Sequence, residues 1–525
     1  MLILGIGGLV HDASAVLVRD GELIAAAEAE KIIRQHHPGG LPHQAIEACL
    51  AIAKKRPDQI DRISLARPLG AGGDSAFNLQ LKSLFPNSRI VIVDHHTAHA
   101  AAAFYPSPFD GATVLTLDHA GDMRCGALWH AQGSRIDPVE ELYLPDSPAA
   151  FYSSITELLG FRAGAEEHKV QWISVGGEPR FRDRFLAILR TGNGNLPRLD
   201  HSYFDTSRAV GGGFADKFFA DTGITRNGSL PEKDRADIAA SVQSAVETVV
   251  LDMAGEGGNL CLGGGLALNA LLVAALEDSG RYKQVWAQPV AGNAGTALGA
   301  ALHTWHQVLR NEKRSPLKNL FVGPAFDREH IKKILENCKL RFRYLMTDKE
   351  LVDTAVKRIN SHEIVAWFQG PMEFGPRALG NRSIFASPLN PYSSENLNTY
   401  IKRRESFRKF AASVPEELAG EYFEASPNAR FLTTVSRVRD EHRKRFEAAL
   451  LDGNRIRVHT VRREDNPLCW DLLHATGKAS GLPVLYNTSF NLFGEPLVSD
   501  PRGAVRSFYA SGIDAMFVGN FLLEK

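Results

Sequence analysis

The same order of strands and turns occurs twice in the N-terminal half of this chain, about 110 residues apart. Residues 2–30 (LILGIGGLVHDASAVLVRDGELIAAAEAE) are typical of an apolar strand, a glycine-rich turn, a second strand, a tight turn and a third strand. Residues 112–143 repeat this order, with a strand in ATVLTLD and a polar turn in HAGD. A repeated supersecondary unit of this kind predicts a duplicated α/β domain.

The rest of the chain is predicted to add helices to this domain and then to form a second α/β unit. Residues 233–254 have helical periodicity and acidic residues near their start. A polar, lysine-rich stretch with two amphipathic helices follows Arg314, and we place the domain boundary there, giving units 1–345 and 346–525. The second unit opens with a strand from Glu363 and ends with a helix followed by a closing strand.

Composition narrows the class of protein. The 525 residues include 60 Lys+Arg and 60 Asp+Glu, and this zero net charge argues against a nucleic-acid partner. No apolar run approaches the ~18 residues of a membrane span, and the apolar N-terminus lacks the basic flank of a signal peptide. The five cysteines form no CxxC pair, so neither a disulfide framework nor a cysteine zinc site is expected. We therefore expect a cytoplasmic protein without a membrane partner.

A pair of histidines suggests a metal site. His95 and His99 lie four residues apart in the alanine-rich segment DHHTAHAAAAF, and this spacing puts both imidazoles on one face of a helix. Asp118 ends an apolar strand, where a carboxylate can complete a metal shell. The bland alternatives are a chance histidine pair and an aspartate that caps a turn.

Three glycine-rich turns follow predicted strands: residues 5–8, 263–265 and 292–295. Glycine lets backbone N–H groups approach a phosphate, so the three turns together favour a nucleotide cleft. Glycine also serves ordinary turns and close helix packing, and that alternative stays open. Because neither GxxxxGK[ST] nor GxGxxG follows a strand, the P-loop and Rossmann classes are excluded.

The second unit carries a cluster of basic and amide side chains. Its members are Arg377 and Arg382 in FQGPMEFGPRALGNRS, Lys402, Arg403, Arg404 and Arg408 in IKRRESFRKF, and Asn487, Thr488 and Ser489 in LYNTSFN. Guanidinium and ammonium groups suit a small dianion such as phosphate, and amide and hydroxyl groups can orient a carbonyl. The alternative for KRRESFRK is a solvated basic helix face.

Taken together, these segments resemble the NodU/CmcH carbamoyltransferase family, the O-carbamoyltransferases of antibiotic and nodulation-factor tailoring. The resemblance runs nearly end to end. It rests on HDASAVLVRDGEL, the HHxxHA stretch at 95–100, LGGGLALN, GNAGTALGAAL, MEFGPRALGNRSI, IKRRESFR and NTSFNLFGEP. It implies an actin/Hsp70-like (ASKHA) N-terminal domain and a YrdC-like C-terminal domain, that is, an α/β protein throughout.

The resemblance also implies a reaction in two steps. In the C-terminal domain, carbamoyl phosphate and ATP, with Mg²⁺, give a carbamoyl adenylate. In the N-terminal domain, a hydroxyl or amine of a small metabolite attacks this mixed anhydride and AMP leaves. The expected partners are this small-molecule acceptor and a second copy of the chain in a homodimer.

Site residues follow from the family's motifs. The implied residues are His11 as the base beside the acceptor, Lys402 and Arg408 as catalytic groups, Arg377, Lys402, Arg408, Arg457, Asn487 and Ser489 as carbamoyl-phosphate and ATP ligands, Lys169, Gly263, Gly264, Gly265 and Asn269 as N-terminal nucleotide ligands, and His95, His99, Asp118 and Asn293 as ligands of a divalent metal, iron (Fe²⁺) in the relatives.

The chain departs from the family pattern in the N-terminal cleft. Asn293 stands where the family usually has an aspartate as the fourth metal ligand, and a neutral amide oxygen is the weaker ligand. Trp172 replaces a glycine near the expected nucleotide. These changes leave two alternatives: a non-catalytic or metal-independent homologue that acts as a nucleotide-binding partner, and a sugar-kinase-like phosphotransferase that would release ADP.

Overall fold

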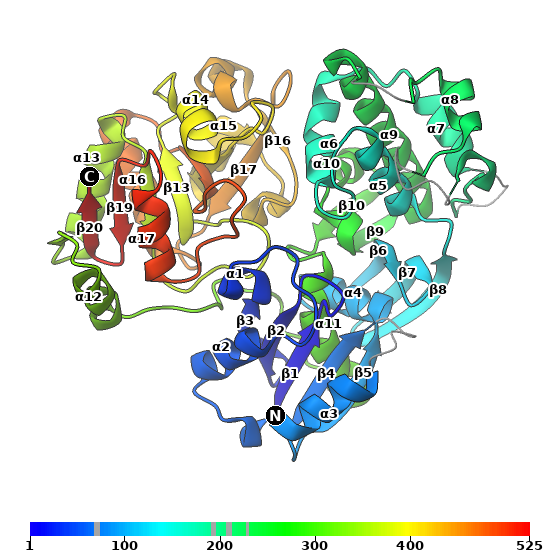
Figure 1. The fold of residues 1–525 in the computed structure, drawn as a ribbon, viewed down its shortest axis with the longest axis horizontal. Helices are drawn as coiled ribbons and strands as arrows, with labels where there is room; N and C mark the ends of the chain where they lie inside the picture. The colour runs from blue at the N-terminus through cyan, green and yellow to red at the C-terminus, as the bar shows by residue number, and fades with distance from the viewer. Residues whose placement is uncertain (68–73, 191–195, 206–212, 227–229) are drawn as a thin grey trace.

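The computed structural model describes residues 1–67, 74–190, 196–205, 213–226 and 230–525. Figure 1 shows three lobes: a first lobe at the N-terminus, a second lobe continuous with it, and a C-terminal domain that lies beside both. Each lobe is built around its own β-sheet.

The first lobe is a five-stranded sheet with helices. Its strands are β1 (Leu2–Gly7), β2 (Ser14–Arg19), β3 (Glu22–Glu28), β4 (Arg62–Arg67) and β5 (Arg89–Asp94), and its helices are α1 (Ala29–Ile33), α2 (His43–Ala53) and α3 (Asp74–Leu84). The sheet order is β3-β2-β1-β4-β5. Strands β1 to β3 form an antiparallel meander, and β4 and β5 run parallel to β1.

The second lobe repeats this topology. Its strands are β6 (Gly111–Gly121), β7 (Arg124–Gln132), β8 (Arg135–Tyr143), β9 (Gly257–Gly263) and β10 (Tyr282–Ala287), in the order β10-β9-β6-β7-β8. Its helices are α5 (Pro148–Leu158), α6 (Glu167–Ile173), α7 (Arg182–Leu189), α8 (Asp216–Thr222), α9 (Glu232–Ala254) and α10 (Ala270–Asp278). The predicted duplicated α/β domain is confirmed, and α9 matches the helix expected at 233–254.

One turn lies later than predicted. Strand β6 continues through the predicted turn HAGD as far as Gly121, and the chain reverses at Asp122 and Met123. Both of these residues have positive φ, a conformation that residues other than glycine rarely adopt and that suits a tight turn.

Two helices lie between the two repeated sheets. They are α4 (His95–Phe104) and α11 (Thr296–His303), and their alanines share one core with β1 and β6. The helices touch backbone to backbone, because a Cβ built on Gly299 would lie 1.7 Å from the carbonyl oxygen of Ala98. This close approach fixes α4, and with it the histidine pair, against both sheets.

The C-terminal domain is a three-layer α/β sandwich. Its sheet has ten strands in the order β11-β20-β19-β12-β13-β18-β14-β17-β16-β15. They are β11 (Arg343–Tyr344), β12 (Val365–Phe368), β13 (Arg382–Ala386), β14 (Ala411–Pro415), β15 (Phe423–Glu424), β16 (Ser436–Val438), β17 (Arg455–Val461), β18 (Leu485–Ser489), β19 (Ala515–Val518) and β20 (Phe521–Glu524).

Helices cover both faces of this sheet. Along β12, Val365 and Trp367 pack against α13 (Asp348–Asn360) and α16 (Pro467–Ser480). The alternate residues of β12 pack against α12 (Arg328–Asn337) and α17 (Pro501–Tyr509) on the other face. This alternation is the period of a strand that is buried on both sides.

The C-terminal domain begins earlier in the chain than residue 345 and ends in a pair of strands. Helix α12, which precedes residue 345, packs in the core of the C-terminal sheet, and β11 pairs with β20. The chain was predicted to end in a helix and one strand, but α17 is followed by the antiparallel pair β19 and β20. Across the described ranges, no helix is both long and apolar enough to cross a membrane.

The contact at Gly299 makes a testable prediction. Gly299→Ala should lower the free energy of unfolding by about 1–3 kcal/mol, the usual effect of overpacking a tight core. The measurement is the midpoint of urea unfolding. Gly258→Ala is the matched control, since a Cβ there meets nothing within 4 Å. Equal midpoints for the two variants would contradict the prediction.

Candidate active site

Three predicted metal ligands meet at the junction of α4 and β6. His95 Nε2 and His99 Nε2 lie 3.1 Å apart, and Asp118 Oδ2 lies 3.2 Å from the first and 3.0 Å from the second. Both histidines are buried, and their helix begins at His95, whose N–H donates to Asp122. Although burial opposes it, the hydrogen bonds from the two histidines hold the pKa of Asp118 well below its usual value.

This donor set fits a divalent transition metal. Two imidazoles and one carboxylate are the facial donor set of non-haem Fe²⁺ sites, and cis ligands at about 2.1 Å from an octahedral ion lie about 3.0 Å apart. The backbone of Ala291 hydrogen-bonds His99, as the outer shell of a metal site commonly does. The structure thus brings His95, His99 and Asp118 together, and metal binding itself stays a prediction.

Asn293, the fourth predicted metal ligand, contacts His11. Its Nδ2 lies 3.0 Å from His11 Nε2, and its Oδ1 is buried without a hydrogen-bond partner among the described residues. Buried amide oxygens usually accept a hydrogen bond, so one without a partner is a candidate ligand for a cation.

His11 is oriented by its neighbour in sequence. Its Nδ1 lies 2.8 Å from Asp12 Oδ2, and His37 Nδ1 lies 2.8 Å from the other oxygen of that carboxylate. An ionised carboxylate only accepts, so Nδ1 carries a proton and Nε2 is the basic atom when the ring is neutral. The hydrogen bond to Asp12 raises the pKa of His11, with burial opposing. His37 was not singled out in the sequence, because no local motif contains it.

The C-terminal basic cluster is not a solvated helix face. The helical turn Asn396–Lys402 ends at Lys402, whose ammonium is buried and donates to Asn491 Oδ1 (2.6 Å) and to Ser489 O. Burial lowers the pKa of Lys402, and the charges of Arg404 and Arg408 add to this effect. Lys402 is thereby tied to the turn that carries Ser489.

Four arginines share the site without carboxylate partners. Arg377, Arg404, Arg408 and Arg457 form no ion pair within 4 Å in the described part of the chain, and Arg457 Nε is buried without a hydrogen-bond partner. Burial first, and then the charge of Arg408, lowers the pKa of Arg377 to about 10. Burial and the other three arginines lower the pKa of Arg457 as well. Guanidinium groups held close together in this way suit a phosphate-like anion, and anion binding itself stays a prediction.

Two further members of the predicted cluster have different surroundings. Asn487 donates to Ala378 O and Ser413 Oγ, while its buried Oδ1 has no partner among the described residues. Arg382 is fully buried, and its guanidinium donates to backbone carbonyls that include those of Gln369 and Gly370. Arg382 therefore holds the backbone, whereas the Oδ1 of Asn487 stays available as a hydrogen-bond acceptor.

The loop that carries Arg377 is held by residues that the sequence analysis did not single out. Glu373 Oε1 accepts from the backbone N–H groups of Leu379, Asn381 and Arg382. From the first lobe, Lys31 Nζ donates to Gly375 O at 2.6 Å, and Glu28 Oε2 accepts from Gly375 N at 3.0 Å. The Glu-x-x-Lys spacing after an apolar strand was the available signal for the last two.

A cavity of about 270 Å³ is lined by residues from both domains. Asp12, His37 and Asn293 line it from the N-terminal domain. Arg377, Ser489 and Asn491 line it from the C-terminal domain. Asn293 from the acceptor side and Arg377 and Ser489 from the anion side of the predicted site therefore border one cavity that is open to solvent.

The predicted N-terminal nucleotide ligands have other contacts. Lys169 pairs with Glu405 (2.8 Å) and Glu166 (3.0 Å), and Asn269 caps α10 by accepting from Leu271 N and Leu272 N. Gly263, Gly264 and Gly265 bring the end of β9 against His99, Leu117 and Asp118 respectively. Trp172 packs on α10, and Arg457 lies 5.4 Å from its ring. Nucleotide binding by these residues stays a prediction.

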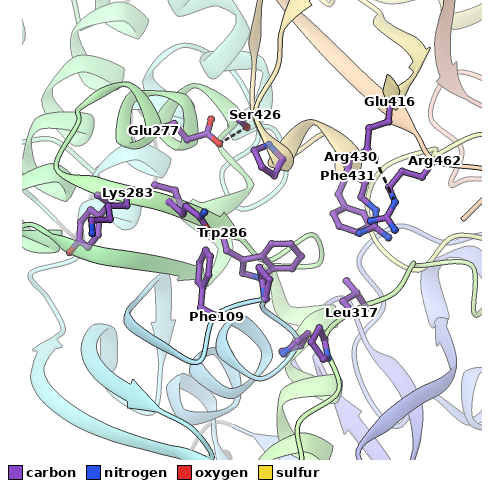
Figure 2. A pocket seen from close by; sticks show the side chains of 17 residues that line it. Phe109, Glu277, Lys283, Trp286, Leu317, Glu416, Ser426, Arg430, Phe431 and Arg462 are labelled. Atoms are coloured by element: carbon purple, nitrogen blue, oxygen red, sulfur yellow. Dashed lines mark hydrogen bonds and ion pairs between the residues drawn. The ribbon is translucent and has the colours of Figure 1, made fainter. Parts of the chain in front are cut away.

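Another cavity, of about 510 Å³, lies elsewhere and is drawn in Figure 2. Aromatic side chains such as Trp286 and Phe431 line it, together with Arg430 and Arg462. These two arginines are already paired: Arg430 with Asp465, and Arg462 with the carboxylates of Glu416 and Glu464 among others. Unlike the arginine cluster, this cavity offers no free guanidinium to an anion.

Comparison with known proteins identifies the family. The chain matches the family "Carbamoyltransferase N-terminus" over residues 2–68 and 73–302 and "Carbamoyltransferase C-terminus" over residues 356–525. It therefore belongs to the carbamoyltransferase family and is a carbamoyltransferase enzyme, as the motifs predicted.

Two relatives are similar to the chain over nearly all of its length, and one solved structure is similar to part of it. Nodulation protein NolNO of Sinorhizobium fredii is 32% identical over 565 residues, which cover 98% of this chain and 79% of that protein. An uncharacterized protein of Synechocystis sp. is 35% identical over 595 residues, which cover 100% of this chain and 96% of that protein. Among solved structures, full-length HypF aligns with 60% of this chain and 47% of its own, at 14% identity and a TM-score of 0.36.

The metal cluster gives the second prediction. Protein purified without chelator should hold less than one equivalent of divalent metal, and Asn293→Asp should raise that occupancy, because an anionic oxygen is the stronger ligand. Elemental analysis measures both. His95→Gln should abolish binding, whereas His130→Gln, at an exposed histidine of β7, should not change it. A protein that stays metal-free after Asn293→Asp would refute the metal site.

Proposed function

We propose that this enzyme transfers a carbamoyl group from carbamoyl phosphate to a hydroxyl or amine of a small metabolite, with ATP consumed and carbamoyl adenylate as the intermediate. The observation that carries the proposal is the cavity lined at one side by Arg377 and Ser489 and at the other by Asp12 and Asn293. An intermediate formed at one side would have only this cavity to cross before reaching the other, and so short a path would limit its hydrolysis by water.

The first step belongs to the arginine cluster. Water cleaves carbamoyl phosphate to carbamate and phosphate; a carbamate oxygen then attacks the α-phosphorus of ATP, and pyrophosphate leaves. Both reactions develop negative charge on phosphate oxygens, which the unpaired guanidiniums of Arg377, Arg408 and Arg457 can stabilise. Mg²⁺ would accompany ATP. The free oxygen of Asn487 can accept from the carbamate amide.

The second step belongs to the N-terminal side. The acceptor oxygen or nitrogen attacks the carbamoyl carbon, the bond to the adenylate oxygen breaks, and AMP leaves. His11 Nε2 can take the acceptor proton, with Asp12 holding the ring through Nδ1. The acceptor must displace the Asn293 amide, which occupies Nε2 in this structure.

A divalent metal would be held by His95, His99 and Asp118, and it would supply a Lewis acid near the reacting carbamoyl group. The chain's own residues prepare that position. The hydrogen bond from His95 N to Asp122 fixes the start of α4, and the backbone of Ala291 fixes the His99 ring.

The anion site gives the third prediction. Arg377→Ala or Arg408→Ala removes a charge-assisted hydrogen bond worth about 1.5–3 kcal/mol, so pyrophosphate release that depends on carbamoyl phosphate should fall at least about tenfold. Arg445→Ala, at an exposed arginine, is the matched control and should leave the rate unchanged. Full activity in both cluster variants would refute the proposed site.

The two steps are separated by a fourth prediction. His11→Asn should leave pyrophosphate release near the wild-type rate but slow transfer to the acceptor about 10²-fold, the lower range for loss of an acid–base group. Pyrophosphate and carbamoylated product are measured in the same reaction, with hydroxylamine as a generic acceptor. Loss of both steps together would indicate misfolding, and loss of neither would show that His11 is only a turn residue.

A further inference from the structure

Helix α6 of the second lobe reaches across to the arginine cluster of the C-terminal domain. Lys169 Nζ lies 2.8 Å from Glu405 Oε1, an ion pair between the two domains. One turn later on the same helix, Trp172 contacts Arg457. The cluster is therefore bordered by a helix that belongs to the other domain.

Glu405 is the carboxylate that could most readily pair with Arg408 and so block the cluster. It lies three residues before Arg408, and Arg408 N donates to Glu405 O at 3.2 Å, so the two residues share a turn. Among the charges that act on Arg408, Glu405 has the strongest effect, followed by Glu166. Lys169 pairs with both of these carboxylates. If the Glu405 side chain rotated away from Lys169, its carboxylate could pair with the guanidinium of Arg408.

We propose that Lys169 is a positioning residue that holds Glu405 away from Arg408 and so keeps the arginine cluster open to phosphate groups. The physical reason is competition between cations for one carboxylate. An Arg408–Glu405 pair would be stable in this partly buried place, and a phosphate ligand would have to break it before binding. Lys169 satisfies the same carboxylate from outside the cluster, so Arg408 meets the ligand unpaired.

The other cationic side chains around Arg408 do not hold Glu405 away from it. Arg377, Arg404 and Arg457 are cationic, and none of them is paired with Glu405 in the described part of the chain. They make the cluster attract any free carboxylate more strongly. This inference rests on the proposed phosphate site, but it concerns anion affinity and does not require the reaction.

The test is a double-mutant cycle on the full chain, with inorganic pyrophosphate as the probe and calorimetry as the readout. Lys169→Met should weaken pyrophosphate binding about tenfold, since Glu405 then competes for Arg408. Glu405→Gln should bind at least as tightly as the wild type. The double variant Lys169→Met/Glu405→Gln should recover to within about threefold of the wild type, because the competitor is gone.

Three controls accompany the cycle. Lys169→Arg keeps the charge and should bind like the wild type. Arg437→Met breaks another interdomain ion pair, with Asp278 at 2.5 Å on the surface, and should change nothing. Arg408→Ala should abolish the tight binding and so locate the probe in the cluster.

Two results would overturn the proposal: wild-type affinity in Lys169→Met, or a double variant that binds as weakly as Lys169→Met alone. A wild type that binds no pyrophosphate would also overturn it. Failure of the proposed function looks different. In that case the cycle behaves as described, but the wild type releases no pyrophosphate from ATP in the presence of carbamoyl phosphate.

Discussion

Mutual repulsion between Arg377, Arg404, Arg408 and Arg457 is the constraint on which the functional half of this structure depends. Four partly buried guanidiniums without carboxylate partners among the described residues oppose folding, so their backbones must be held by other contacts. Glu373 supplies one of these contacts by accepting three backbone N–H groups in the loop that carries Arg377. A site built this way is poised for an anion, because a ligand relieves the repulsion that the fold maintains.

Several of the contacts that hold the arginine cluster in place come from the N-terminal domain. Lys31 and Glu28 hold the loop at Gly375, and Lys169 holds the turn at Glu405. The C-terminal domain therefore does not complete its own anion site. This arrangement gives a physical reason for the two domains to be joined in one chain, since a separate C-terminal domain would lose each of these contacts.

The acceptor side depends on close backbone packing. Helices α4 and α11 meet at Gly299, and the end of β9 approaches His99 and Asp118 through glycines. Short side chains let the two repeated sheets face each other across a thin layer of helix. The three predicted metal-ligand atoms then converge to within 3.2 Å, although their residues come from a helix and from a strand in the next repeat.

The sequence predicted the elements that repeat or alternate. The two meanders and the strand at Val365 follow from short apolar runs between turns, and helix 233–254 follows from a period of 3.6 residues, because side-chain burial sets both patterns locally. The turn after Asp118 was placed too early, because HAGD has turn composition while tertiary pairing extends β6 to Gly121. The glycine-rich turns suggested a nucleotide cleft, whereas Gly263 to Gly265 also serve close packing against the histidine pair.

The sequence by itself determined the family, the duplicated α/β architecture and the residue types of the site, because long motifs and periodic patterns are local properties of the chain. Tertiary structure decided which of those residues remain able to contact a ligand. Arg382 and Arg377 lie in one motif, but burial commits the first to backbone carbonyls and leaves the second facing the cavity. Likewise, the pairing of Lys169 with Glu405 joins residues more than two hundred positions apart. No local pattern encodes such a contact, since it depends on how the domains pack.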